Sequence, residues 1–136
     1  MLSKRARYAI KALLFLYENK EKTPISAKLI SENENIPYKF LENILRELRQ
    51  SKILKSERGA GGGYRFSKEP SEITIADIIR IIDGPIALIP CVSLNFYEKC
   101  DECDDEATCK IKKLFVQLRT EMLPILNKSL VEVERL

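Results

Sequence analysis

The glycines of this chain are concentrated in one short stretch, which constrains the fold more than any other feature. Four of the five glycines fall within residues 58–64, which read RGAGGGY. Runs that favour strands flank this stretch at 53–57 and 65–67. Glycine adds nothing to a core, but it adopts positive φ and lets the backbone approach another surface closely. We therefore predict a β-hairpin with a Gly-rich turn, and the flanking Arg58 and Arg65 favour a phosphate backbone as the surface that it meets.

Helical periodicity precedes this hairpin. The spacing of apolar residues predicts a helix from Ser3 to about Tyr17, a short helix capped by Ser26, and a third helix over residues 37–50. Two helices joined by a tight turn and followed by a hairpin give the order of a winged helix-turn-helix domain. The predicted apolar face of the third helix consists of Phe40, Leu41, Ile44, Leu45 and Leu48.

The second half of the chain is predicted to be helical around a loop. Thr74 and Asp77 match a capping box for a helix that Gly84 ends, and a long helix begins near Lys110. We expect a mainly α fold with a small β-hairpin. Its three units are a winged helix-turn-helix DNA-binding domain at 1–84, a cysteine-rich metal- or cluster-binding loop at 85–109, and a dimerisation helix with a C-terminal tail at 110–136.

The long helix carries an apolar stripe for which the rest of the chain offers no obvious core partner. We therefore predict that this stripe forms a homodimer interface. It consists of Ile111, Leu114, Phe115, Leu118, Met122 and Ile125.

Charge is distributed unevenly along the chain. Residues 1–80 carry 16 Lys and Arg against 10 Asp and Glu, whereas residues 81–136 carry 7 against 10. A basic first half favours an anionic partner, of which nucleic acid is the commonest. No apolar run approaches the roughly 20 residues that a membrane span needs, and the basic N-terminus lacks the apolar region of a signal peptide. We expect a cytoplasmic protein with no membrane partner and with reduced thiols.

The polar face of the third helix offers candidate contacts to DNA bases. Lys39 and Arg46 suit phosphate or guanine, Asn43 suits adenine, and Glu42 suits the amino group of cytosine. In the alternative interpretation, Glu42 is a solvated residue that pairs with Arg46 at i+4, and the sequence leaves both open. The alternative for the Gly-rich turn is an ordinary flexible hairpin, which the entropy cost of such a turn disfavours.

All four cysteines lie in one segment of the predicted loop, as Cys91, Cys100, Cys103 and Cys109. Four clustered thiols in a cytosolic chain favour a metal over disulfides. Two interpretations stay open: a structural zinc held by four thiolates, or a Cys-ligated iron–sulfur cluster that acts as a sensor. Free surface thiols are the remaining alternative. The chain has no histidine, which excludes a His-ligated site, and the acidic neighbours of the thiols disfavour a bare thiolate cluster, a repulsion that a bound cation would relieve.

Together these residues resemble the Rrf-two family of bacterial regulators, which includes IscR, NsrR and CymR branches. The resemblance covers nearly the whole chain and rests on four features. SKRARYAI at 3–10 resembles the opening helix of the family, PYKFLE at 37–42 its recognition helix, RGAGGGY its wing signature, and Cys91 the start of its cluster loop.

The resemblance implies a homodimeric winged-helix repressor or activator whose last long helix forms the dimer interface. It implies that Glu42 reads a base and that the wing contacts DNA through Arg58, Gly59, Gly61, Gly62, Gly63 and Tyr64. The IscR branch holds a 2Fe–2S cluster with three Cys and one His, and here an additional Cys103 substitutes for the missing His. The NsrR branch completes a 4Fe–4S site with an Asp near the N-terminus, where this chain has Arg7, which cannot ligate. Some members bind no cluster.

We therefore predict a sequence-specific, DNA-binding transcriptional regulator of bacterial type that binds a pseudo-palindromic operator in double-stranded DNA. It would sense redox, iron–sulfur or nitric oxide status through a Cys-ligated cluster, with zinc as the alternative occupant of the site. The alternative function is a zinc-stabilised or cluster-free dimeric module that acts through a protein partner or as an interaction scaffold. An enzyme is not expected, because the chain has neither a phosphate-binding loop followed by Lys nor a nucleophile–base pair.

Overall fold

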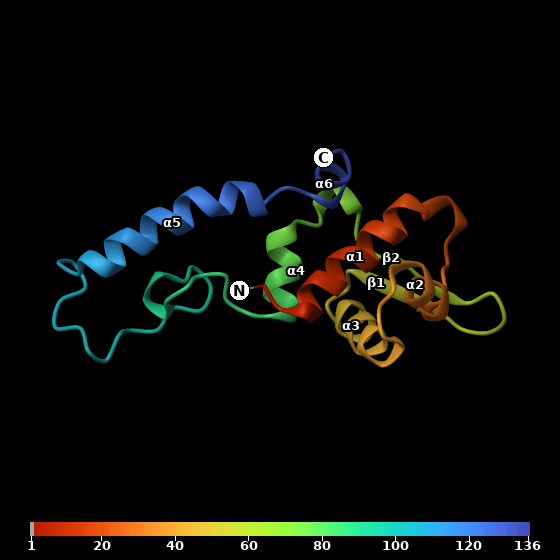
Figure 1. Ribbon diagram of the computed structural model, residues 1–136, viewed down its shortest axis with the longest axis horizontal. Helices are drawn as coiled ribbons and strands as arrows, with labels where there is room; N and C mark the ends of the chain where they lie inside the picture. The colour runs from red at the N-terminus through yellow and green to blue at the C-terminus, as the bar shows by residue number, and fades with distance from the viewer. Residues whose placement is uncertain (1) are drawn as a thin grey trace.

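Helices make up most of the structure, a computed structural model that describes residues 2–136 (Figure 1). The strands β1 (Leu54–Glu57) and β2 (Gly63–Phe66) pair as one antiparallel hairpin. The expected mainly α fold, with a small hairpin and a long C-terminal helix, is confirmed. The helices are α1 (Lys4–Glu18), α2 (Ala27–Glu34), α3 (Tyr38–Gln50), α4 (Ile75–Ile82), α5 (Lys110–Leu126) and α6 (Leu130–Glu134), and three 3-10 turns are η1 (Lys20–Lys22), η2 (Pro70–Glu72) and η3 (Pro90–Val92).

Side-chain caps fix where the helices of the first half begin. The Ser3 hydroxyl accepts a hydrogen bond from the Ala6 amide at 3.0 Å, and Ser26 caps α2 in the same way. The capping box predicted at the start of α4 is confirmed, since Thr74 and Asp77 each accept a bond from the backbone amide of the other. Each cap satisfies an amide that the helix itself leaves unpaired, so the local sequence determines these boundaries.

The core lies between α1, α3 and α4, with α2 and the hairpin against its edge. On α3 the buried side chains are Leu41, Ile44, Leu45 and Leu48, as predicted. The prediction that Phe40 lies on this buried face is wrong, because 53% of its surface is exposed. It lies one residue before Leu41, about 100° around the helix, and so points away from the core.

The hairpin is attached to the segment that precedes α2. Within the hairpin, Leu54 pairs with Phe66 and Glu57 with Gly63. Tyr64 also exchanges two backbone hydrogen bonds with Ile25, at 2.8 and 3.0 Å. This bridge holds the base of the hairpin against the helix-turn-helix, so the hairpin has a defined position relative to α3.

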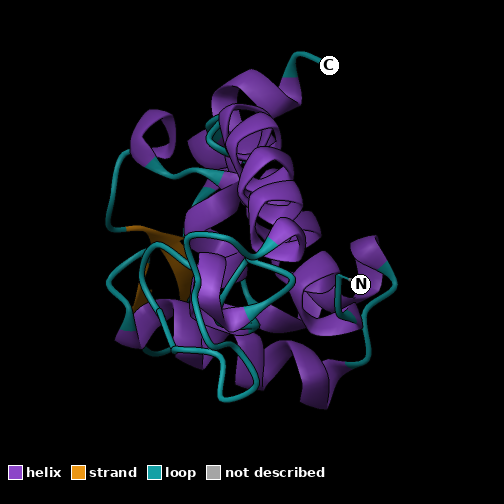
Figure 2. Ribbon diagram, turned by 90° about the vertical axis from the view of Figure 1, so that its left-hand side faces the viewer, coloured by secondary structure: helices purple, strands orange, loops and turns teal. Residues whose placement is uncertain are grey.

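The long helix α5 projects away from the winged-helix end of the molecule. Residues 85–109 lead out from α4 and α5 returns toward it, which places the cysteine-containing loop at the opposite end from the Gly-rich turn (Figure 1). Figure 2 views this end, where the loops of the segment lie in front of the helices. None of the helices within residues 2–136 is long and apolar enough to cross a membrane.

The C-terminal segment returns to the main hydrophobic core between α1, α3 and α4. The Leu130 amide donates to the Ile73 carbonyl at 2.9 Å, and the Ile75 amide donates to the Lys128 carbonyl at 3.1 Å. Ser129 caps α6 through a second capping box with Glu132. Leu130 is fully buried in the main hydrophobic cluster. Core residues therefore come from the chain both before and after the projecting arm, by which we mean residues 85–126.

Candidate functional site

The predicted DNA-contacting residues of α3 lie on its solvent-exposed face. Lys39, Glu42, Asn43 and Arg46 are all exposed, while the opposite face of the helix is buried in the core. The side chains are therefore free to meet a partner, and their helix is held rigidly from behind.

Glu42 interacts with a tyrosine on the preceding turn rather than with Arg46. Its carboxylate raises the pKa of Tyr38, both by hydrogen bonding and by its charge. Arg46 instead donates to the Asn43 side-chain oxygen at 3.3 Å, and no Glu42–Arg46 ion pair within 4.0 Å occurs in the part of the chain described. The alternative in which Glu42 only pairs with Arg46 thus has no support here.

The glycines of the hairpin divide into two pairs. Gly59 and Gly61 lie at the exposed tip with positive φ and open space around them. A Cβ at Gly63 would collide with the backbone of Ile25 and Ser26, and one at Gly62 would collide with the turn itself. The second pair therefore has internal reasons to be glycine: the turn is tight at Gly62, and at Gly63 the hairpin approaches the segment before α2 closely.

The two arginines that flank the turn also differ, because one is exposed and the other has partners within the protein. Arg58 is exposed and forms no ion pair within residues 2–136. Arg65 lies with its Nε 2.8 Å from Glu57 Oε1, and its Nη2 donates to the Thr23 carbonyl at 3.3 Å. Arg65 is thus used to fix the hairpin, and Arg58 remains available to a partner. Tyr64, half-buried, packs against the core.

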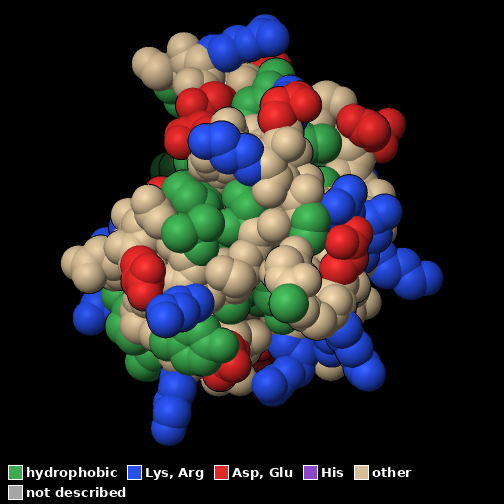
Figure 3. Space-filling model, turned by 90° about the vertical axis from the view of Figure 1, so that its right-hand side faces the viewer, with side chains coloured by type: hydrophobic (Ala, Val, Ile, Leu, Met, Phe, Trp, Pro, Cys, Tyr) green, Lys and Arg blue, Asp and Glu red, His purple; other side chains and the backbone are tan. Residues whose placement is uncertain are grey.

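Contacts that the sequence did not reveal hold α3 in place. Arg49 Nη1 donates to Ser56 Oγ of β1 at 3.4 Å, and Arg5 of α1 forms an ion pair with Glu47. Seen from the winged-helix end, Lys and Arg side chains project along the lower edge of the molecule (Figure 3). The helix that presents the candidate base contacts is thus fixed to both α1 and the hairpin, within a basic surface.

The second candidate site is a pocket of about 370 Å³ lined by all four cysteines. Cys91 lies on η3, and Cys109 is the N-cap of α5, where its sulfur accepts from the Lys112 amide at 3.4 Å. Burial raises the pKa of the Cys103 thiol, and the neighbouring Cys109 and Cys100 raise it further. Residues that are up to 18 positions apart are thus brought to one place, as the spacing predicted.

The chemistry of this donor set fits a metal centre. Sulfur ligands suit zinc and iron–sulfur clusters, and all four thiols are free. The thiols are not arranged in the geometry of a bound metal, because within residues 2–136 no three Cys, Asp or Glu side chains lie close enough together to hold one ion. We refer to these residues and the space between them as the cysteine pocket.

Three side chains that the sequence did not single out as a group form a cluster at the cysteine pocket. The Tyr97 hydroxyl donates to Glu106 Oε1 at 2.6 Å, and Lys112 Nζ lies 2.5 Å from Glu106 Oε2 and 5.8 Å from the centre of the Tyr97 ring. Lys112 and then Tyr97 lower the pKa of Glu106, while Glu106 raises the pKa of both partners. Glu106 was expected to repel the thiols, and its charge does help to raise the pKa of the Cys103 thiol, although Glu106 is also paired with Lys112.

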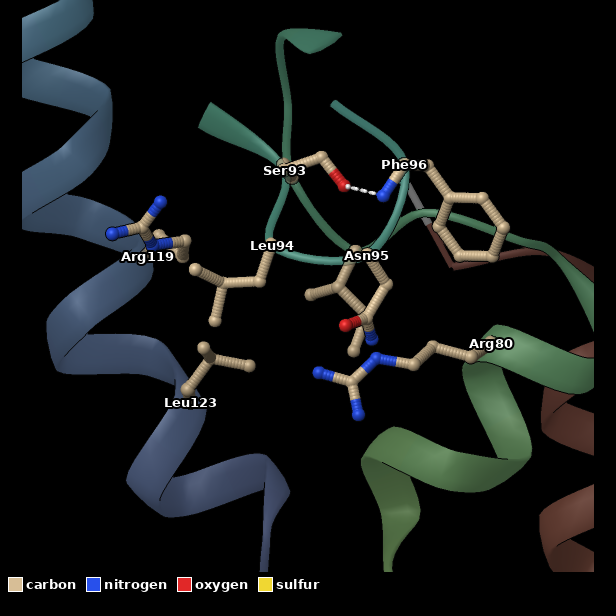
Figure 4. A pocket seen from close by; sticks show the side chains of 9 residues that line it. Arg80, Ser93, Leu94, Asn95, Phe96, Arg119 and Leu123 are labelled. Atoms are coloured by element: carbon tan, nitrogen blue, oxygen red, sulfur yellow. Dashed lines mark hydrogen bonds between the residues drawn. The ribbon is translucent and has the colours of Figure 1, made fainter. Parts of the chain in front are cut away.

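Side chains of α4, the cysteine-containing loop and α5 meet in one contact region. Arg80 extends from α4 across this region and ends beside Asn95 of the loop, opposite Leu123 of α5 (Figure 4). Arg119 Nη1 of α5 donates to the Val92 carbonyl at 2.5 Å. Val92 is buried and follows Cys91 directly. The start of the cysteine pocket is therefore tied to the middle of α5.

The predicted interface residues of α5 leave a large apolar surface uncovered. Ile111, Leu114 and Ile125 each expose more than 60% of their surface, and Leu118 exposes 41%. Phe115 and Met122 are partly buried. Exposed apolar surface of this extent is uncommon on a monomer.

Comparisons with known proteins agree with this arrangement. The Rrf2 family model, described as an iron-dependent transcriptional regulator, matches residues 2–133. An rrf2-like HTH-type transcriptional regulator of Rhodobacter capsulatus is 38% identical over 135 residues, which are 97% of this chain and 90% of the relative. The structure of CymR, the global cysteine regulator of B. subtilis, is similar with a TM-score of 0.81 and 29% identity over 99% of this chain and 96% of that one. T. potens IscR, at 24% identity and a TM-score of 0.76, shares the fold over 99% of this chain and 86% of that one.

Proposed function

Because the chain belongs to the Rrf2 family of iron-dependent transcriptional regulators, we propose that it is a homodimer that reads a pseudo-palindromic operator and responds to a metal centre in its cysteine pocket. At the level of the family, it is a DNA-binding transcriptional regulator of the CymR and IscR type and not an enzyme. The proposal adds the residues that would read DNA, hold the metal and form the dimer.

The observation that carries the DNA-reading surface is the exposed polar face of α3 beside a hairpin with a free arginine. Lys39, Asn43 and Arg46 supply donors for base edges or phosphates, and Glu42 supplies an acceptor for a cytosine amino group. A carboxylate facing DNA is repelled by phosphate, so Glu42 contributes mainly by selecting a base. Arg58, with Gly59 and Gly61 at the open tip, contacts the phosphate backbone, while Gly62, Gly63 and Tyr64 shape and anchor the hairpin.

The dimer follows from the uncovered apolar stripe of α5. A two-fold dimer places two copies of α3 so that they meet equivalent half-sites about one helical turn apart or more. A pseudo-palindromic operator is the sequence that such a pair reads.

Cys91, Cys100, Cys103 and Cys109 would hold the metal centre. An iron–sulfur cluster supplies a centre whose charge and oxidation state change, whereas zinc supplies a fixed structural centre. The family description favours iron. Both ends of the cysteine pocket are connected to α5, through Arg119 at one end and the Cys109 cap at the other. Order in the loop therefore affects the helix that joins the two protomers, which is a route to altered operator affinity.

Operator binding with a salt titration tests the DNA-reading surface. The operator is first selected from random double-stranded DNA. Arg58→Ala should then weaken binding and reduce the salt slope by about one unit, because one phosphate contact is lost. Arg135→Ala removes the same charge just after α6 and should leave the slope unchanged. Glu42→Ala should relax base preference at a cost in affinity of about 1–3 kcal/mol or less. A footprint confined to one asymmetric half-site would contradict the proposal.

Metal analysis tests the cysteine pocket. Protein purified without air is assayed for iron, sulfide and zinc together with its visible absorption. Single Cys→Ser variants at the four positions should each lower the metal content. Full metal content in all four variants would refute the site, and equal operator affinity with and without metal would refute the sensor. A protein that holds zinc and ignores every DNA sequence would point to the interaction scaffold instead.

A further inference from the structure

The middle of the cysteine loop is the part that the rest of the fold does not fix. Cys91 is positioned by η3, whose Val92 is buried and bonded to Arg119. Cys109 is positioned as the cap of α5. Between them, residues 94–108 contain no helix or strand and carry Cys100 and Cys103. A metal site built from all four thiols needs this middle segment to be held as well.

The cluster of Tyr97, Glu106 and Lys112 spans the same gap. Tyr97 lies three residues before Cys100, Glu106 lies midway between Cys103 and Cys109, and Lys112 lies in the first turn of α5. Glu106 bonds to both others at 2.5–2.6 Å, with about four-fifths of the Glu106 side chain and three-quarters of the Lys112 side chain shielded from solvent. These bonds connect the two halves of the loop to each other and to the helix.

The geometry points to Tyr97, Glu106 and Lys112 as a clamp that positions Cys100 and Cys103 in the cysteine pocket. The three are positioning residues and not ligands. Glu106 uses one carboxylate oxygen for Tyr97 and the other for Lys112. Glu106 lines the cysteine pocket, but both of its carboxylate oxygens already have a partner, which disfavours it as a competing oxygen ligand. The inference rests on the proposed metal site, but the clamp itself is a property of the protein without metal.

A positioning role and a purely electrostatic role predict different signs. Lys112→Met removes a positive charge near the thiols, and Glu106→Gln removes a negative one. If only charge mattered, the two variants would shift thiol reactivity in opposite directions. If the clamp positions the loop, both variants release the same segment, and both should raise the exposure and reactivity of Cys100 and Cys103.

The experiment uses the full-length protein in two states. In the metal-free state, the rate at which Ellman's reagent modifies the four thiols should rise several-fold in both Lys112→Met and Glu106→Gln, and to a smaller extent in Tyr97→Phe. In the zinc-loaded state, transfer of zinc to a coloured chelator should accelerate about tenfold, as is usual when a partner that orients metal ligands is lost. The double variant should equal the stronger single variant, because both break one cluster.

Controls separate the clamp from general effects. Lys113→Met removes an exposed lysine beside the clamp and should leave both rates unchanged, and Lys112→Arg should retain most of the wild-type behaviour. Opposite shifts in Lys112→Met and Glu106→Gln, or a change in Lys113→Met as large as in Lys112→Met, would overturn the clamp. A wild-type protein that binds neither zinc nor iron would refute the proposed metal site, while the metal-free reactivity would still decide the clamp.

Discussion

At the first turn of α3, one pair of side chains reports on the environment of the face that we propose reads DNA. Tyr38 and Glu42 lie one turn apart on α3, and the charge of Tyr64 in the hairpin has a smaller effect in the same direction on the pKa of Tyr38. The hydrogen bond and the charge of Glu42 raise the pKa of Tyr38. The two side chains are therefore electrostatically coupled on the face that we propose reads DNA.

Glu42→Gln should therefore lower the pKa of Tyr38 toward the ordinary value of about 10. A raised pKa means that the folded protein favours the neutral phenol. This contribution to stability is present below the ordinary pKa and is lost as the pH rises through the higher value in the folded state. NMR titration of ring-labelled tyrosine, assigned with Tyr38→Phe, measures the shift. Glu32→Gln on α2 is the control, and an unchanged Tyr38 pKa in Glu42→Gln would disprove the interaction.

The two arginines around the Gly-rich turn show what a local pattern can and cannot determine. The glycines and both arginines predicted a hairpin directed at phosphate, and the hairpin is present. Only Arg58 lies beyond the paired strands, whereas Arg65 lies within β2 opposite Lys55 and meets Glu57 and Thr23. Thr23 is 42 residues away in the chain, so no reading of the turn alone could separate the two roles.

At the scale of elements, the helix boundaries were the most predictable part of the fold. Ser3, Ser26 and Thr74 determine them through bonds to residues three positions away. Phe40 was misplaced because its position at the edge of the apolar stripe depends on what covers it. The docking of α6 was not predicted, because five residues of helix give little periodic signal and their partner, residues 73–75, lies far away in sequence.

The docking of α6 should be a substantial part of the stability of the winged-helix domain. Leu130 is fully buried, so Leu130→Ala should lower the free energy of unfolding by about 2–5 kcal/mol. Leu136 is 88% exposed, and Leu136→Ala should change the free energy of unfolding by no more than about 0.5 kcal/mol. Urea denaturation of both variants measures the difference. Equal values would mean that the C-terminal segment is not part of the core.

At the scale of the whole molecule, the chain leaves the core after α4, forms the projecting arm and returns to the core at α6. The spacing of the cysteines predicted that they meet, and they do line one pocket. The clamp was not predicted, because Tyr97, Glu106 and Lys112 form no motif and are brought together only by the path of the loop. The run of lysines at the start of α5, next to an acidic loop, was the one available signal.

We propose that the arm joins two protomers. Ile111, Leu114, Leu118 and Ile125 of its apolar stripe are exposed, although the hydrophobic cluster of residues before and after the arm is well buried. In a two-fold dimer each stripe residue is buried in both protomers. Burying one leucine side chain contributes about 1.5–3 kcal/mol, so the stripe supplies enough apolar surface to hold a dimer at low protein concentration.

Leu118→Lys combined with Met122→Lys should therefore produce monomers. Two charges are placed in the centre of the interface, and the symmetry of the dimer doubles their effect. A loss of even 3 kcal/mol raises the dissociation constant by more than a hundredfold. Sedimentation velocity across a range of concentrations measures it, and Gln117→Lys is the control because it adds the same charge to α5 outside the stripe. The monomer should keep its fold and bind single half-sites weakly, since each recognition helix is complete within one protomer. A double variant that still sediments as a dimer would place the interface elsewhere on the molecule.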